Sequence, residues 1–273
     1  MTVGSPALAN RSRMAFLCYH SVASPGPPFL SISAETFEGH LAVLRQKGWK
    51  SGSEETLARL SAGERLRDRT AFLTFDDGYL DNYVTVFPLL QAAGLTAFVF
   101  VVPPLLGNKE LRWEGVEDSC DQYPDVMRSM TWEMVEEMAA AGNVIGSHTN
   151  THPHLDQIGD EQLRDELVDS RRAIVERLGS CDSLAFPYGS WNARVREAAR
   201  DAGYRWAFTL PRRGERGADP LAIPRIAVDH RDDARRFGLK LQPLTRRAIL
   251  SPWRGPVEDV ARGVVQKVRQ RRT

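Results

Sequence analysis

The sequence lacks several features that would each assign a protein to a class. Its 3 cysteines in 273 residues, Cys18, Cys120 and Cys181, are far apart and include no CxxC pair. This argues against a disulfide framework and against a cysteine-based zinc site. Neither charge is in excess, because 36 Lys and Arg face 35 Asp and Glu for a net charge of +1. No general attraction to nucleic acid is therefore expected.

Long apolar runs are missing as well. No stretch of about 18 apolar residues could span a membrane, and residues 1–13 contain Ser, Pro, Asn and two Arg without the apolar centre of a secretion signal. These absences lead us to expect a cytoplasmic protein whose residues 1–13 are a disordered segment.

What the sequence does contain is a repeated alternation of helical patterns that end in glycine and short apolar runs. This alternation is typical of βα units around a parallel sheet. The expected strands share an apolar composition and begin at Met14, Thr70, Thr96, Asn143, Ser183, Arg205 and Arg225. About seven strands favour a closed or nearly closed barrel, formed as a single domain by residues 14–241. The longest expected helix covers residues 160–178, with Glu166 among its solvated positions.

Two adjacent carboxylates, Asp76 and Asp77, follow the apolar run 71–73 and precede Gly78. Paired carboxylates repel each other and resist burial, so a strand end that keeps both commonly serves a cation or a proton. Gly78 would allow a sharp turn that directs both side chains toward one cavity. The alternative interpretation is a solvated Asp-Gly turn.

Three of the six histidines fall within residues 148–154. His148 and His152 have a spacing suited to a first-row metal, and Pro153 places them on a loop or a single turn. Two histidines and one carboxylate leave coordination positions open, as a catalytic metal requires. Because His20, the Asp pair and His148 all follow expected strands, we expect them to converge on the C-terminal face of the barrel.

Two further segments lie outside the βα alternation. Residues 103–130 form a long irregular insertion that contains Trp113 and follows a strand, so it is a candidate lid or glycan-contacting wall, or a simple packing element. Residues 242–273 form a basic C-terminal extension, which would contact an anionic membrane surface or carrier or remain a solvated terminus. The arginines expected to make this contact are Arg246, Arg247, Arg269, Arg271 and Arg272.

Three motifs carry a family resemblance: Thr-Phe-Asp-Asp-Gly at 74–78, His-Thr-Asn-Thr-His-Pro at 148–153 and Phe-Pro-Tyr-Gly at 186–189. Together they resemble the polysaccharide deacetylases, also called the NodB homology domain or carbohydrate esterase family four. The Tyr-His pair at 19–20 resembles the exopolysaccharide branch. The resemblance extends to about Leu241 and implies a distorted (β/α) barrel of seven or eight mostly parallel strands.

The resemblance also implies roles for individual residues. Asp77, His148 and His152 would hold one divalent metal, expected to be zinc, although nickel, cobalt or iron(II) would suit the same ligands. Asp76 would be the general base. The oxyanion would meet the backbone N–H of Tyr188, which follows Pro187 in the third motif.

The sequence departs from the family pattern in two places. Ala185 occupies the position where relatives often have an arginine that pairs with the base, and we expect Arg225 to replace it from a neighbouring strand. The usual Leu-x-x-His motif for a general acid is not clear. His20 is therefore the expected second catalytic imidazole, and His230 is a weaker candidate.

These features predict a metal-dependent hydrolase that removes acetyl groups from an N-acetylated amino sugar. Its substrate would be an oligo- or polysaccharide, or a nucleotide-linked or carrier-linked precursor, with no nucleic-acid partner. Two alternatives remain open at this point. One is an O-acetyl carbohydrate esterase, which passes through the same kind of oxyanion, and the other is a carbohydrate-binding protein that has lost catalysis.

Overall fold

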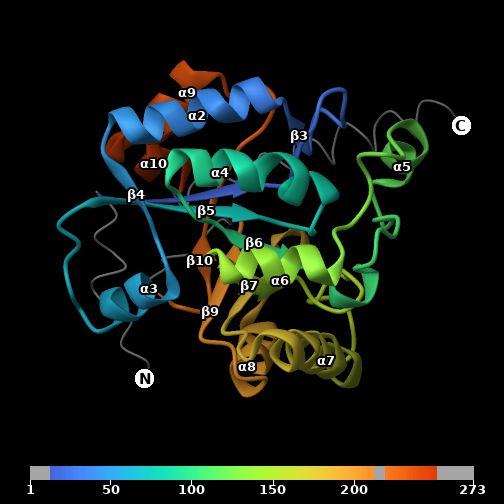
Figure 1. The fold of residues 1–273 in the computed structure, drawn as a ribbon. Helices are drawn as coiled ribbons and strands as arrows, with labels where there is room; N and C mark the ends of the chain where they lie inside the picture. Colours follow the sequence, from blue (N-terminus) through green and yellow to red (C-terminus); the bar gives the residue numbers. More distant parts are fainter. Residues whose placement is uncertain (1–12, 212–218, 251–273) are drawn as a thin grey trace, which may run out of the picture.

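The structure, a computed structural model, describes residues 13–211 and 219–250. Its main feature is a nine-stranded sheet in the order β10-β9-β8-β7-β6-β5-β1-β11, with β4 paired to β5 (Figure 1). All pairings between these strands are parallel. The strands are β1 (Met14–Tyr19), β4 (Trp49–Ser51), β5 (Arg69–Phe75), β6 (Phe98–Val101), β7 (Val144–Ser147), β8 (Ser183–Ala185), β9 (Trp206–Thr209), β10 (Ile223–Pro224) and β11 (Ile226–Ala227).

The two ends of the sheet meet at residues 223–227, which nearly close the barrel. β10 pairs with β9 on one side, β11 pairs with β1 on the other, and Arg225 lies between them. The Arg225 N–H donates to the Thr209 carbonyl at 2.8 Å, and the Val228 N–H donates to the Cys18 carbonyl at 2.9 Å. The prediction of a nearly closed, mostly parallel barrel is therefore confirmed. The sheet has more strands than expected because β4 adds one and Arg225 divides the closing strand.

Aromatic side chains fill the barrel interior. Phe16, Phe72, Phe98, Phe100 and Phe208 belong to one buried cluster, in which the Phe16 and Phe72 rings stack with centroids 4.4 Å apart. Successive residues of a strand point to opposite faces. Phe16 therefore points inward, while Ala15, Leu17 and Tyr19 of the same strand pack against the helices.

Helices cover the outside of the sheet in two groups that lie on opposite sides of it (Figure 1). One group consists of α2 (Ala34–Gln46), α4 (Phe87–Ala93), α9 (Ala234–Lys240) and α10 (Pro243–Ile249), and the other contains α7 (Asp160–Leu178) and α8 (Ala193–Asp201). The remaining elements are α3 (Glu54–Ser61), η2 (Asn82–Val86), η3 (Pro103–Leu105), α5 (Glu117–Gln122), α6 (Trp132–Ala140), η4 (Pro187–Gly189), β2 (Ser21–Val22) and β3 (Ser31–Ile32).

Helix α7 has the predicted bounds, but one of its predicted solvated positions is wrong. Leu163, Leu167 and Ile174 are buried as the apolar stripe requires, yet Glu166 is buried too. The 3.6-residue period places Glu166 beside Leu163 and Ser170, which are also buried. The charge is accommodated because backbone N–H groups of a neighbouring loop donate to it.

The basic extension begins as an ordered part of the barrel. Helix α10 places Ile249 and Leu250 against the cluster that also contains α2 and α9. Arg246 is buried, with its guanidinium 5.4 Å from the centre of the Trp49 ring. The prediction that Arg246 contacts a membrane surface is therefore wrong, while Arg269, Arg271 and Arg272 lie outside the described residues. Within 13–211 and 219–250, no helix combines the length and apolar character needed to cross a bilayer.

Candidate active site

The Asp76-Asp77 pair lies at the C-terminal end of β5, where the backbone turns sharply. Asp77 and Gly78 have φ angles of 74° and 75°, a conformation that costs little for glycine and more for other residues. A Cβ atom at position 78 would also meet Val101 Cγ1 at 3.1 Å. Because of this turn, the two carboxylates point in different directions and contact different side chains.

His148 and His152 lie on the loop that follows β7. Thr149 and His152 have positive φ angles of 68° and 61°, so the loop is not the helical turn that their spacing allowed. Glu166 of α7 holds it: one carboxylate oxygen accepts from the N–H groups of Asn150 and Thr151, both at 2.8 Å. Strained residues of this kind often occur at functional sites.

Asp77, His148 and His152 form a buried three-residue cluster. Asp77 Oδ1 is 3.3 Å from His148 Nε2 and 3.4 Å from His152 Nε2. Two N or O ligands about 2.0 to 2.1 Å from a tetrahedral zinc ion lie about 3.3 to 3.4 Å apart. These separations fit a metal ion held by all three residues.

Hydrogen bonding at the cluster supports the same assignment. His148 Nδ1 lies 2.8 Å from the Ala185 carbonyl, which can only accept, so Nδ1 carries a proton and Nε2 faces Asp77. Among the described residues, Asp77 Oδ1 is buried without a hydrogen-bond partner. A buried carboxylate oxygen in this condition normally has a cation to bind.

Asp76 forms a buried ion pair with Arg225. Arg225 Nη1 donates to Asp76 Oδ1 at 2.6 Å, and Nη2 donates to Oδ2 at 2.7 Å. Both side chains are buried, at 3% exposure for Asp76 and 1% for Arg225. Arg225 thus pairs with Asp76 as expected, and residues 223–227, which close the barrel, bring it there.

Two opposing effects act on the pKa of each carboxylate. Burial by itself would raise the pKa of Asp76, but the charge of Arg225, with smaller contributions from His148 and His20, holds it below its ordinary value. Burial also acts to raise the pKa of Asp77, which His148 and His152 hold well below its ordinary value. Both carboxylates are therefore ionised near neutral pH.

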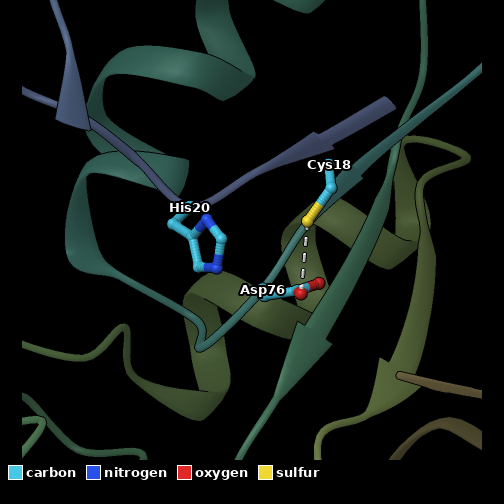
Figure 2. Close-up of side chains that lie close together, drawn as sticks. All are labelled: Cys18, His20 and Asp76. Atoms are coloured by element: carbon cyan, nitrogen blue, oxygen red, sulfur yellow. Dashed lines mark hydrogen bonds between the residues drawn. The ribbon is translucent and has the colours of Figure 1, made fainter. Parts of the chain in front are cut away.

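His20 lies just after β1 and is half-buried beside Asp76 (Figure 2). Its backbone is anchored from the segment that follows the Asp pair. Asn82 Nδ2 donates to the His20 carbonyl at 2.8 Å. Asp81 accepts from the Ser21 hydroxyl at 2.6 Å and from the Val22 N–H at 2.9 Å.

Aromatic rings enclose His152. The Trp113 ring stacks on it with centroids 4.1 Å apart, and the Tyr188 ring meets it edge-on at 4.7 Å. Tyr188 Oη donates to the Glu114 carbonyl at 3.0 Å and so links the third motif to the insertion. The insertion 103–130, which contains η3 and α5, therefore forms a wall of the site and is less irregular than expected.

The remaining predicted residues differ in position. Pro187 is buried in η4, where Tyr188 has a φ of 57°. His230 is exposed on the loop after β11, and its described contact is with the Pro28 carbonyl. The structure therefore does not bring His230 to the described cluster, and His20 is the imidazole found beside Asp76.

Three residues near the site were missed by reasoning from the sequence. Cys18 could have been found, because it lies two residues before His20 on the inward face of β1. Glu166 and Asp81 gave no signal, since their importance comes from contacts with distant loops.

The family model for polysaccharide deacetylases matches residues 63–207. The chain belongs to this family. The match includes both aspartates and both histidines of the site, but neither His20 nor Arg225.

Individual polysaccharide deacetylases resemble the chain over most of its length. A candidate polysaccharide deacetylase of Bacillus subtilis (strain 168), YxkH, is 25% identical over 236 residues, covering 85% of this chain and 77% of that protein. The poly-beta-1,6-N-acetyl-D-glucosamine N-deacetylase of Escherichia coli (strain K12) is 23% identical over 246 residues. The alignment covers 78% of this chain but only 36% of that enzyme.

A solved structure shows the same fold. IcaB from Ammonifex degensii superimposes with a TM-score of 0.70 and 27% identity, covering 85% of this chain and 97% of that one. The prediction of a deacetylase of this family is thereby confirmed.

Proposed function

We propose that this polysaccharide deacetylase is a metal-dependent amidase that removes the acetyl group from an N-acetylated amino sugar in a glycan. The observation that carries the proposal is the pairing of two functions at one strand end. Asp77 joins two histidines at metal-ligand separations, and the adjacent Asp76 is kept ionised by Arg225. A protein that only bound carbohydrate would not need the second carboxylate.

The residues divide the chemistry between them. A divalent ion held by Asp77, His148 and His152, with zinc the expected one, would lower the pKa of a water molecule to about 7 and polarise the acetyl carbonyl. Asp76 accepts the proton of the attacking water. The Tyr188 N–H donates to the developing oxyanion. His20, beside Asp76, donates a proton to the leaving amine.

The walls of the site suit a sugar ring. Trp113 and Tyr188 both pack against His152, and aromatic rings beside a site can pack against the apolar faces of a pyranose. The N-acetylglucosamine polymer named for the Escherichia coli relative supports an N-acetyl substrate. Oligosaccharides and carrier-linked or nucleotide-linked precursors present the same acetamido group.

Acetate release tests the proposal. The substrates are N-acetylglucosamine oligomers, poly-beta-1,6-N-acetyl-D-glucosamine, a UDP-linked N-acetyl sugar and an O-acetylated xylan. Each is incubated with wild type, Asp76→Asn and metal-stripped protein. We expect release from an amide substrate, loss of release in both controls, and recovery when metal is returned to the stripped protein. Release from the xylan alone would replace the amidase by an esterase, and full activity in Asp76→Asn would remove Asp76 as the base.

A further inference from the structure

We propose that Cys18, His20 and Asp76 form a second metal site, specific for thiol-binding divalent cations, whose occupation inhibits the enzyme. The three side chains come from the end of β1 and the end of β5 and turn toward a common space (Figure 2). One ligand atom from each lies within 4.8 Å of the others. The site shares no residue with the Asp77, His148 and His152 cluster.

The geometry at the thiol fits a metal ion. Cys18 Sγ is 3.5 Å from Asp76 Oδ2. A sulfur about 2.3 Å and an oxygen about 2.1 Å from a tetrahedral zinc ion lie about 3.6 Å apart. A cation can therefore replace the thiol proton between these two atoms with little movement.

Access and ligand direction also favour binding. Cys18 shares the inward face of β1 with Phe16, and His20 follows it on the same face after one intervening residue. Cys18 is 1% exposed, whereas His20 is half-buried and connects the site to solvent. A cation entering from solvent would therefore bind the His20 imidazole first and the buried Cys18 sulfur second.

Arg225 does not prevent binding, because it uses only part of the capacity of Asp76. Each carboxylate oxygen can accept two interactions, and Arg225 donates one hydrogen bond to each. Binding releases the Cys18 thiol proton to solvent. A dication is then attracted by two negative charges, that of the Cys18 thiolate and that of the Asp76 carboxylate. The Arg225 guanidinium repels the cation, so the negative charge of the thiolate is needed to offset this repulsion.

The chemistry of the ligands sets the selectivity. A thiolate selects zinc, cadmium and copper(I), whereas magnesium and manganese prefer oxygen ligands. Excess zinc would therefore occupy the lone pairs with which Asp76 accepts a proton, while excess manganese would not. This inhibition rests on the proposed function, but the existence of the site does not.

The site is tested by titrating zinc-loaded protein with cadmium and recording the ultraviolet charge-transfer band of a cadmium–thiolate bond. The first cluster has no sulfur, so cadmium exchange there gives no such band. We expect the band in wild type, in Cys120→Ser and in Cys181→Ser, and its loss in Cys18→Ser. In His20→Ala, which keeps the thiol, the cadmium affinity should fall by more than about tenfold, because losing a ligand costs more than losing an outer partner.

Acetate release, measured in parallel, tests the inhibition. Excess zinc should inhibit wild type but not Cys18→Ser, each measured relative to its own activity without added zinc, and equal manganese should inhibit neither. No cadmium band in wild type, or a band that persists in Cys18→Ser, would overturn the site. Equal zinc inhibition of wild type and Cys18→Ser would overturn the inhibitory role. If no substrate releases acetate, the proposed function fails, and the cadmium band still decides whether the site exists.

Discussion

Asp76 and Asp77 are neighbours in sequence and almost equally buried, yet their surroundings are different. Asp77 faces two imidazoles, those of His148 and His152, which lie on the loop after β7. Asp76 faces a permanent cation, Arg225, which arrives with the strand that closes the barrel. Asp77 therefore meets side chains that can share a metal ion with it, whereas Asp76 already has the guanidinium of Arg225 as its partner.

This comparison shows that residue type alone does not set the role of a carboxylate. The family match at 63–207 includes all three residues on the Asp77 side. On the Asp76 side, Cys18, His20 and Arg225 all lie outside that match. The candidate metal site therefore lies within the range matched by the family model, and the environment of Asp76 is assembled from both ends of the barrel.

The largest expected effect separates the two aspartates directly. Asp77→Asn should lose the metal and nearly all activity, because the ligand charge is gone. Asp76→Asn should keep the metal and lose activity by about 10²- to 10⁴-fold, the usual contribution of a general base. Metal content by elemental analysis and acetate release from the same preparations distinguish them. Equal metal loss in both variants would show that the two sides are not independent.

The next largest effect is expected when Arg225, the cation that pairs with Asp76, is removed. Arg225→Ala leaves a buried carboxylate unpaired, so we expect the free energy of unfolding to fall by about 3 to 5 kcal/mol. The pKa of Asp76 should rise once the guanidinium is lost, which moves the acidic limb of the activity profile to higher pH. Urea unfolding and a pH–rate profile measure these effects.

Arg225→Lys is the matched control, because it keeps a charge but loses the two-point contact. It should have intermediate stability and a smaller displacement of the acidic limb. If Arg225→Ala has the wild-type pH profile, the ion pair does not set the pKa of the base.

The Asp77 side depends on Glu166 in a way that a pair of variants can test. Glu166→Ala removes the acceptor of the Asn150 and Thr151 N–H groups and should weaken zinc binding by about 10- to 100-fold. Glu166→Gln keeps an oxygen for both donors and can donate to the Thr151 hydroxyl, so its zinc affinity should stay near wild type. Competition with a chromogenic chelator measures both affinities. Similar losses in the two variants would indicate that the negative charge, and not the hydrogen bonding, holds the loop.

The smallest effect concerns Asp81, which anchors the segment after His20. Burial raises the pKa of Asp81 to about 6, despite the Ser21, Val22 and Asn82 donors. Because the folded pKa exceeds the unfolded one, this group contributes stability below about pH 4 and loses it as pH rises through about 6.

The advantage of wild type over Asp81→Asn should therefore decrease by about 2 kcal/mol between pH 4 and pH 7. Asparagine is a suitable replacement because its amide oxygen can still accept from Val22. Urea unfolding of both proteins at the two pH values tests this. A constant difference would mean that the pKa of Asp81 is the same in the folded and the unfolded protein.

The sequence by itself determined much of this protein. Short apolar runs after glycine-ended helices predict the parallel barrel, since local periodicity reports which face of each element is buried. Spacing and chemistry predict that the Asp76-Asp77 pair meets the two histidines, because parallel strands deliver their C-terminal ends to the same face. The family resemblance singles out Asp77 as the partner of His148 and His152.

Only the tertiary structure decided the partners that come from distant segments. Arg225 reaches Asp76 because the closing strand pairs with both β9 and β1, and Glu166 is buried because α7 packs beneath the histidine loop. His230 was predicted near the site but lies away from it, whereas Cys18 was not predicted there and lies beside Asp76. The search for a general acid made His230 a weak candidate, but the chain carries it to the surface. Cys18 belongs to no motif, yet it lies against Asp76. A local pattern fixes which way a side chain faces, and the packing of distant segments fixes what it meets.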